Sequence, residues 1–178
     1  ARSRVRGGAA GGTFSSPPVV GADGTEQFET RQPAVDAATA GETIRVRPGN
    51  YTNLTLSKNV TVRFDEGARL AQPGDASTAV EIVGTAAPTV VNATVVGYDT
   101  AVDARETDSD WTLQGVTVTA PTTEHGAIQA TGSTGNWSVR NATLTGAGIT
   151  AFGSRGDWVV ADTSVSTASL GVAAGSSR

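Results

Sequence analysis

One nine-residue motif, which occurs three times within residues 110–165, constrains the fold of this chain more than any other feature. Each copy begins with an Asp or Asn followed by a tryptophan, and Trp111, Trp137 and Trp158 are separated by 26 and 21 residues. Internal repeats of roughly 20 to 50 residues are typical of solenoids, propellers and arrays, in which each unit buries its apolar side against its neighbours. The repeat therefore predicts an architecture before it predicts a function.

Polar and apolar residues alternate within each copy, which indicates short strands with one face turned inward. Leu113, Val139 and Val160 lie two positions after the tryptophans and share their side. We therefore predict that the tryptophans form an aromatic ladder in the core; the alternative is an outer platform on which sugars stack. A second inward strand follows in each copy, with the residues Val118, Leu144 and Val165.

Between the two strands of each copy stands Gly115, Asn141 or Asp162, residue types that best tolerate a left-handed backbone. A second marker repeats at intervals of 22, 26, 21 and 21 residues: Val80, Val102, Ile128, Ile149 and Leu170. Two or three short strands per turn of about 22 residues, bent at such corners, predict an all-β parallel β-helix, or β-solenoid.

The segment Pro33–Tyr51, continued by Leu54–Val62, resembles the entry of right-handed parallel β-helix proteins of the pectin-lyase-like superfamily. It is especially similar to the secreted β-helix proteins of halophilic archaea. The resemblance covers residues 33–178 and implies the fold but no activity, because that superfamily mixes polysaccharide lyases and hydrolases, viral tailspikes, adhesins and catalytically silent modules. Pro33 and Gly41 predict a helix over Pro33–Ala40, inside a capping segment 25–41 that precedes a β-helix over residues 42–178.

Both ends of the chain suggest contacts with other molecules. Residues 1–24 are predicted to be a flexible arm, either a solvated tail or a basic strap in which Arg2, Arg4 and Arg6 face an acidic neighbour. The sequence after Leu170 stops within a new turn, which predicts self-association or partner docking through the C-terminal rung.

Composition excludes several classes of function. The net charge of −4 argues against nucleic acid as a partner, and no apolar run reaches the roughly 20 residues of a membrane span. The chain has no cysteine and a single histidine, His125, in a widened turn at Pro121–Gly126. Since metal sites usually need several such ligands, we predict an exposed loop histidine and no cofactor.

The resemblance makes a polysaccharide lyase or a glycosidase the first enzyme to consider. A glycosidase needs two carboxylates at roughly 5–9.5 Å. Glu81 and Asp103 are the best candidates, because the repeat places them outward on adjacent turns, about 4.8 Å apart along the stack. The rest of this possible carbohydrate or calcium face is Arg105, Glu106, Asp108 and Asp110. The alternative without a functional site is a solvated acidic loop that binds Ca²⁺ weakly. We assign no catalytic residue.

Asparagine usage is the most unusual chemical feature. Every Asn heads an Asn-x-Ser/Thr triplet without Pro, the acceptor pattern for N-glycosylation. The six acceptors are Asn50, Asn53, Asn59, Asn92, Asn136 and Asn141. A corner Asn before a strand with an outward Thr would also produce the triplet, so a purely structural origin stays open.

Together these features predict a non-catalytic, extracellular structural or adhesive β-helix, N-glycosylated and self-associating on a cell surface or a virus particle. The alternative is a carbohydrate-active enzyme, or a tailspike-like module that binds polysaccharide near Glu81 and Asp103.

Overall fold

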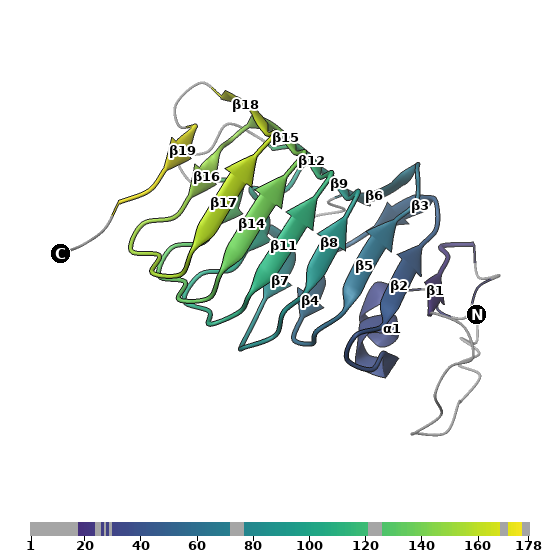
Figure 1. Cartoon of the computed structure of the whole chain (residues 1–178). Helices are drawn as coiled ribbons and strands as arrows, with labels where there is room; N and C mark the ends of the chain where they lie inside the picture. The colour runs from purple at the N-terminus through teal and green to yellow at the C-terminus, as the bar shows by residue number, and fades with distance from the viewer. Residues whose placement is uncertain are drawn as a thin grey trace.

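The chain folds into stacked coils whose strands are all parallel, as the sequence predicts (Figure 1). A computed structural model describes residues 18–23, 26, 28, 30–71, 77–120, 126–167 and 171–175. Three sheets of seven, six and six strands, here sheets A, B and C, run the length of the stack. The predicted parallel β-helix is confirmed.

Each of the six coils contributes one strand to each sheet, and β1 adds a seventh strand to sheet A; the strand bounds are as follows. Sheet A contains β1 (Val19–Val20), β2 (Thr43–Val46), β5 (Thr61–Phe64), β8 (Thr89–Val91), β11 (Trp111–Gln114), β14 (Trp137–Arg140) and β17 (Trp158–Ala161). Sheet B contains β3 (Gly49–Tyr51), β6 (Ala68–Ala71), β9 (Thr94–Val96), β12 (Thr117–Thr119), β15 (Thr143–Gly146) and β18 (Ser164–Thr167). Sheet C contains β4 (Leu54–Leu56), β7 (Thr78–Ile82), β10 (Thr100–Asp103), β13 (Ile128–Gln129), β16 (Ile149–Thr150) and β19 (Val172–Ala173).

The tryptophans form the predicted ladder inside sheet A. Trp111 pairs in register with Trp137, and Trp137 with Trp158. Their rings stack almost parallel, with centroids 5.1 and 5.3 Å apart. Trp111 and Trp137 are 1% and 3% exposed, which confirms their inward orientation. Trp158 is 39% exposed, because β17 is the last strand of sheet A in the part of the chain that the structure describes.

The corner between sheets A and B has nearly constant geometry. Two residues separate the strands at this corner in each of the last four coils. The first of the two has a left-handed backbone, with φ of 58° at Asn92, 67° at Gly115, 51° at Asn141 and 51° at Asp162. The predicted left-handed corner is therefore confirmed, with Asn92 as an additional member.

The last coil is shifted from the predicted register. Val80, Val102, Ile128 and Ile149 do pair in succession, as the repeat predicts. The next partner of Ile149 is Val172, which replaces the predicted Leu170. A spacing of 21 residues cannot be extrapolated here, because the connection from sheet B to sheet C changes length from one coil to the next.

A single short helix, α1 (Arg31–Ala37), covers the first coil. It begins two residues before the predicted Pro33 and ends three before Ala40, because Ala38 is already extended with ψ of 145°. Gln32 ties the helix to the edge of sheet C: its amide group both donates to the carbonyl of Thr55 and accepts from the N–H of Thr55.

Arg31, at the start of α1, is buried against the first coil. Its guanidinium donates to the carbonyls of Thr52 and Asn53 and lies 5.3 Å from the centre of the Tyr51 ring. Burial lowers the pKa of Arg31 to about 10. The helix is thus attached to the stack by a cation–π contact and backbone hydrogen bonds.

The segment before α1 completes the cap and corrects the predicted arm. Val20 is fully buried, and β1 pairs with β2, so residues 18–20 are part of the stack although the sequence places them in an arm over residues 1–24. The other edge of β1 pairs with Phe28 through two backbone hydrogen bonds. Residues 1–17, with the three alternating arginines, lie outside the described residues.

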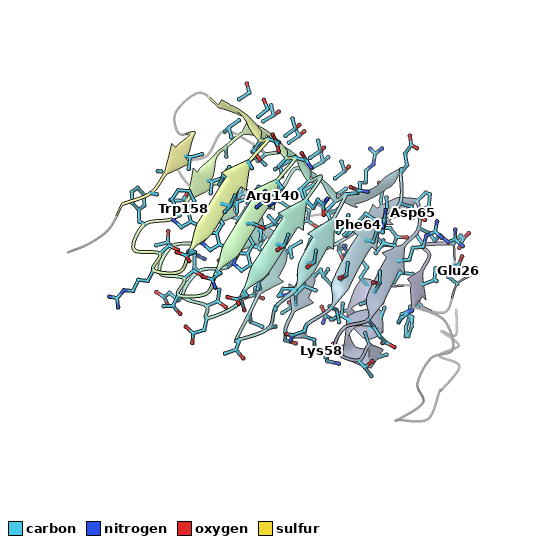
Figure 2. The ribbon with its side chains drawn as sticks, in the orientation of Figure 1. Glu26, Lys58, Phe64, Asp65, Arg140 and Trp158 are labelled. Carbon is cyan, nitrogen blue, oxygen red and sulfur yellow. The ribbon has the colours of Figure 1, made fainter. Side chains whose placement is uncertain are left out.

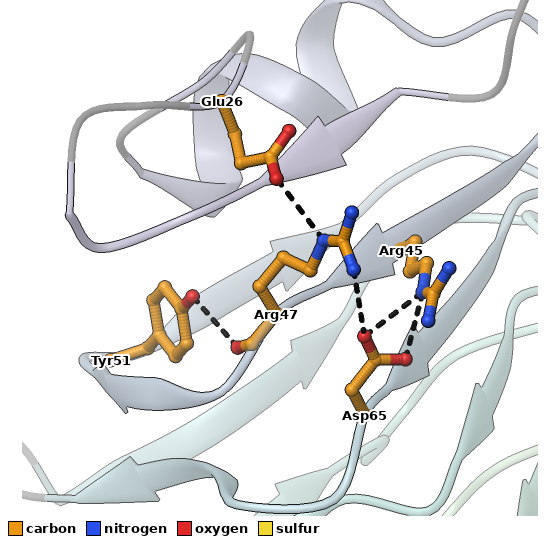
Figure 3. Close-up of polar contacts among 5 residues, drawn as sticks. All are labelled: Glu26, Arg45, Arg47, Tyr51 and Asp65. Carbon is orange, nitrogen blue, oxygen red and sulfur yellow. Dashed lines mark hydrogen bonds and ion pairs between the residues drawn. The ribbon is translucent and has the colours of Figure 1, made fainter.

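An ionic network holds this cap to the first two coils (Figure 3). Arg47 donates to Glu26 at 3.1 Å, and Arg45 donates to both carboxylate oxygens of Asp65 at 2.9 Å. The hydroxyl of Tyr51 donates to the backbone carbonyl of Arg47 at 2.9 Å. Tyr51 is the last residue of β3, the strand of sheet B in the first coil.

Candidate functional site

A groove on the outer surface gathers four of the six residues predicted as a carbohydrate or calcium face. Glu81 at the end of β7 and Asp103 at the end of β10 are neighbours in register. With Arg105 and Glu106 they line an open groove of about 520 Å³, here called the acidic groove. The floor of the acidic groove is formed by Ile82, Val83, Gly84 and Thr107.

Charge in the acidic groove is partly neutralised within the chain. Arg105 donates to both oxygens of Asp103, and the shortest contact is 2.6 Å. This hydrogen bond and the nearby negative charge raise the pKa of Arg105. Glu81 is exposed and accepts a long hydrogen bond of 3.4 Å from the hydroxyl of Thr55. The groove therefore offers the free carboxylate of Glu81 beside an ion pair already formed.

The other two predicted acidic residues do not line this groove. Asp108 accepts a hydrogen bond from the Thr134 hydroxyl, and Asp110 accepts one from the backbone N–H of Asn136 at 2.6 Å. Both carboxylates thus join successive coils. Across the described ranges, no three side chains of the His, Cys, Asp and Glu types come together as a metal site. His125 lies outside the described residues, and weak Ca²⁺ binding stays a prediction.

The in-register pair of carboxylates, Glu81 and Asp103, is not continued on the next coil. The position after Asp103 is Gln129 on the next coil. Gln129 is buried, and its amide donates to the hydroxyl of Thr100 at 2.8 Å. A run of carboxylates along the stack is therefore limited to two coils.

All six predicted glycan acceptors are exposed. Two of them also have structural hydrogen bonds: the Oδ1 atoms of Asn59 and Asn136 accept the N–H of Ala87 and Asp157, each one coil further on. N-glycans attach to the side-chain nitrogen, so the carbonyl oxygen can keep its backbone partner. Exposure is compatible with modification at every acceptor. Asn92 and Asn141 also lie at left-handed corners, which explains the choice of asparagine at these two positions without glycosylation.

A second groove, which the sequence does not reveal as a site, lies along the outer face of sheet A. It has a volume of about 450 Å³, and its floor carries the outward residues Thr89, Thr112, Ser138 and Val159. One wall is the column Asp110, Asn136 and Asp157, which precedes the tryptophans. In the sequence, this wall corresponds to the Asp or Asn that begins each copy of the repeat. Two of these side chains, Asp110 and Asn136, accept a hydrogen bond from a backbone N–H of the next coil.

The last coil carries the most apolar surface of the described chain. The exposed large hydrophobic side chains there are Phe152, Trp158, Val159 and Val172, and the fifth such residue, Val96, lies in β9. We call these four residues the terminal face. Figure 2 labels Trp158 beside the C-terminal end of the stack. The strands β17, β18 and β19 are the last of their sheets among the described residues.

These features define a class of protein: a parallel β-helix whose first coil is covered by a short helix and whose outer surface carries two open grooves. Comparison with family models, with curated proteins and with solved structures found no match to this chain. In the described part of the chain, no helix is both long and apolar enough to cross a membrane.

Proposed function

We propose that this β-helix is a non-catalytic structural or adhesive unit of a cell surface or a virus particle, and that it self-associates through its last coil. The observation that carries the proposal is the terminal face, since four of the five exposed large hydrophobic residues of the described chain lie within residues 152–172. Exposed large apolar side chains concentrated in one part of a soluble protein mark interaction sites.

N-glycosylation belongs to the same proposal. Six exposed acceptor asparagines are consistent with a secreted protein whose solubility and protection come from glycans. The mass of the intact protein, purified from its native source, tests this part. A mass equal to that of the bare chain would refute glycosylation, and peptide mapping would show which acceptors are occupied. The resemblance to secreted β-helix proteins of halophilic archaea supports such a source.

The test of self-association uses a matched pair of variants in the 178-residue chain. Val159→Glu places a charge on the terminal face, and Val96→Glu places the same charge on a residue of similar exposure in β9, away from that face (42% and 37%). Light scattering should show that the wild type and Val96→Glu associate with equal affinity. We expect Val159→Glu to remain folded and monomeric. A monomeric wild type at 100 µM or more, or equal association of all three proteins, would refute the proposal.

A second function, polysaccharide binding, is supported by the acidic groove. Its volume of about 520 Å³ and its mainly polar lining, which includes Glu81 and Arg105 beside Ile82 and Val83, suit a sugar ring with hydroxyl groups. The experiment is a screen of acidic and neutral polysaccharides with and without Ca²⁺, comparing the wild type with Glu81→Gln and Asp103→Ala. If polysaccharide binding survives both substitutions, the acidic groove is not the binding site. If the polysaccharide is cleaved, the alternative of a lyase or glycosidase is supported instead.

A further inference from the structure

We propose that a glycan attached to Asn136 lies in the groove on the outer face of sheet A, so that this groove binds the protein's own sugar. The inference rests on the N-glycosylation proposed above and states, for one acceptor, where its sugar is held. Of the six acceptors, Asn136 is the one that lines a groove: it belongs to the wall of the groove on sheet A, and none of the six lines the acidic groove.

The side chain of Asn136 is fixed in position at this wall. Its Oδ1 accepts the N–H of Asp157 at 2.9 Å, and its own backbone N–H donates to the carboxylate of Asp110 at 2.6 Å. Within the described part of the chain, its Nδ2 has no hydrogen-bond partner. Glycosylation replaces one hydrogen of Nδ2 with the first carbon of a sugar, and the phosphate-linked carrier of that sugar leaves with the proton. The first sugar is therefore attached at a rigid point of the groove.

The hydroxyl residue of the same triplet, Ser138, lies on the floor of the groove. Residues two apart in an extended strand face the same side, so Asn136 and Ser138 both face outward, whereas Trp137 between them is buried. The acceptor, its hydroxyl and the groove thus share one face. Asn92 and Asn141 lie instead at the left-handed corners between sheets A and B, and neither lines a groove.

The lining of the groove suits a sugar ring. Thr89, Thr112 and Ser138 offer hydroxyl groups, and Pro88 and Val159 offer apolar contacts. A sugar ring presents C–H groups on its faces and hydroxyl groups at its edge, so it needs both kinds of partner. Its volume of about 450 Å³ lies within the range of about 300–1,000 Å³ that is usual for sites of small organic ligands.

Covalent attachment makes weak binding sufficient in an open groove. A ligand held by a short flexible link has an effective concentration in the millimolar range. A sugar whose own Kd is about tenfold below that concentration would occupy the groove most of the time and lower the equilibrium constant of unfolding about tenfold. For a chain of this size, the melting temperature would rise by about 3–6 °C.

The experiment compares variants of the whole chain produced in a host that glycosylates Asn-x-Ser/Thr triplets, with peptide mapping to show which acceptors are occupied. Ser138→Ala removes the triplet of Asn136 but keeps the Asn136 side chain. Thr112→Arg keeps the triplet and fills the floor of the groove, and Thr89→Arg is a second variant of this kind. Each is combined with Ser138→Ala. The same proteins from a host that attaches no glycans give the effect of each substitution on the bare chain.

The matched control is Thr143→Ala, which removes the triplet of Asn141. This acceptor lies one corner away from Asn136 on the same coil and lines neither groove. Its glycan should therefore contribute equally to the melting temperature whether the groove is open or filled.

After the bare-chain differences are subtracted, loss of the Asn136 glycan should lower the melting temperature by about 3–6 °C. This loss should disappear in Thr112→Arg and in Thr89→Arg. If Asn136 is occupied and its glycan contributes equally with the groove open and filled, the groove is not its binding site, and glycosylation still stands. If Asn136 carries no glycan, this inference is overturned, and the intact mass shows whether the other acceptors are modified.

Discussion

Replacing the middle tryptophan of the ladder is the sharpest test of how the stack is held together. Trp137 is 3% exposed, and its ring lies between those of Trp111 and Trp158 at 5.1 and 5.3 Å. Its ring nitrogen also donates to the hydroxyl of Ser154 at 3.2 Å. Trp137→Ala would therefore remove a buried side chain, two stacking contacts and one hydrogen bond together.

The magnitude follows from these contacts. Truncating a buried Trp to Ala costs about 3–5 kcal/mol, and each aromatic pair adds about 0.5–1.5 kcal/mol beyond its buried area. We therefore expect Trp137→Ala to lose about 5 kcal/mol of the free energy of unfolding. Trp158 is 39% exposed and has one stacking neighbour, so Trp158→Ala should lose only about 2–3 kcal/mol. The two variants should thus differ by about 2 kcal/mol.

Thermal unfolding followed by circular dichroism measures this difference. At about 2–4 °C per kcal/mol for a chain of this size, Trp137→Ala should melt at least about 4 °C below Trp158→Ala. The comparison belongs at low protein concentration, where the proposed self-association does not contribute. Trp137→Phe keeps a ring in the ladder and should lose less than Trp137→Ala. Equal losses from the two alanine variants would refute a ladder that stabilises the core by burial and stacking.

Three further changes test other parts of the fold. Gly135→Ala should lower stability by about 1–3 kcal/mol in urea unfolding, since a Cβ there meets the backbone carbonyl of the preceding coil, whereas Gly171→Ala enters open space and should be tolerated. Burial raises the pKa of Tyr98, so the folded state resists deprotonation and stability should fall as pH rises through 10. Tyr98→Phe should cost no more than about 1 kcal/mol at pH 7 and make this alkaline fall shallower; an unchanged slope would contradict that origin. Asp65→Asn breaks the exposed pair with Arg45 and should lower the melting temperature slightly at low salt and less at high salt. A loss independent of salt would argue against an ionic origin.

The stack was predictable from sequence because burial and backbone geometry repeat with the coil. The alternation around Leu113 and Val139 fixes which side faces the core, and the left-handed corner selects Gly115 and Asn141. Both signals are local, so they can be recognised in a short segment without knowledge of the rest of the chain.

The parts that escaped prediction depend on contacts between distant segments. Val19–Val20 form a strand only because β2 offers an edge, and Val20 is buried by that pairing. The shift of the last register to Val172 depends on the length of one connection. At the acidic groove, the sequence gives the positions of Glu81 and Asp103, but the side-chain direction of Asp110 depends on the coil to which it bonds.

The connections between sheets differ in their freedom to change length. Two residues separate β15 from β16, whereas eight separate β12 from β13, yet the strands on either side keep their register. By contrast, the connections before β11, β14 and β17 each have seven residues. The corner from sheet B to sheet C can thus accept inserted sequence without disturbing the core. It is the natural position at which to graft a foreign peptide for display, with copies on successive coils spaced about 4.8 Å apart along the stack.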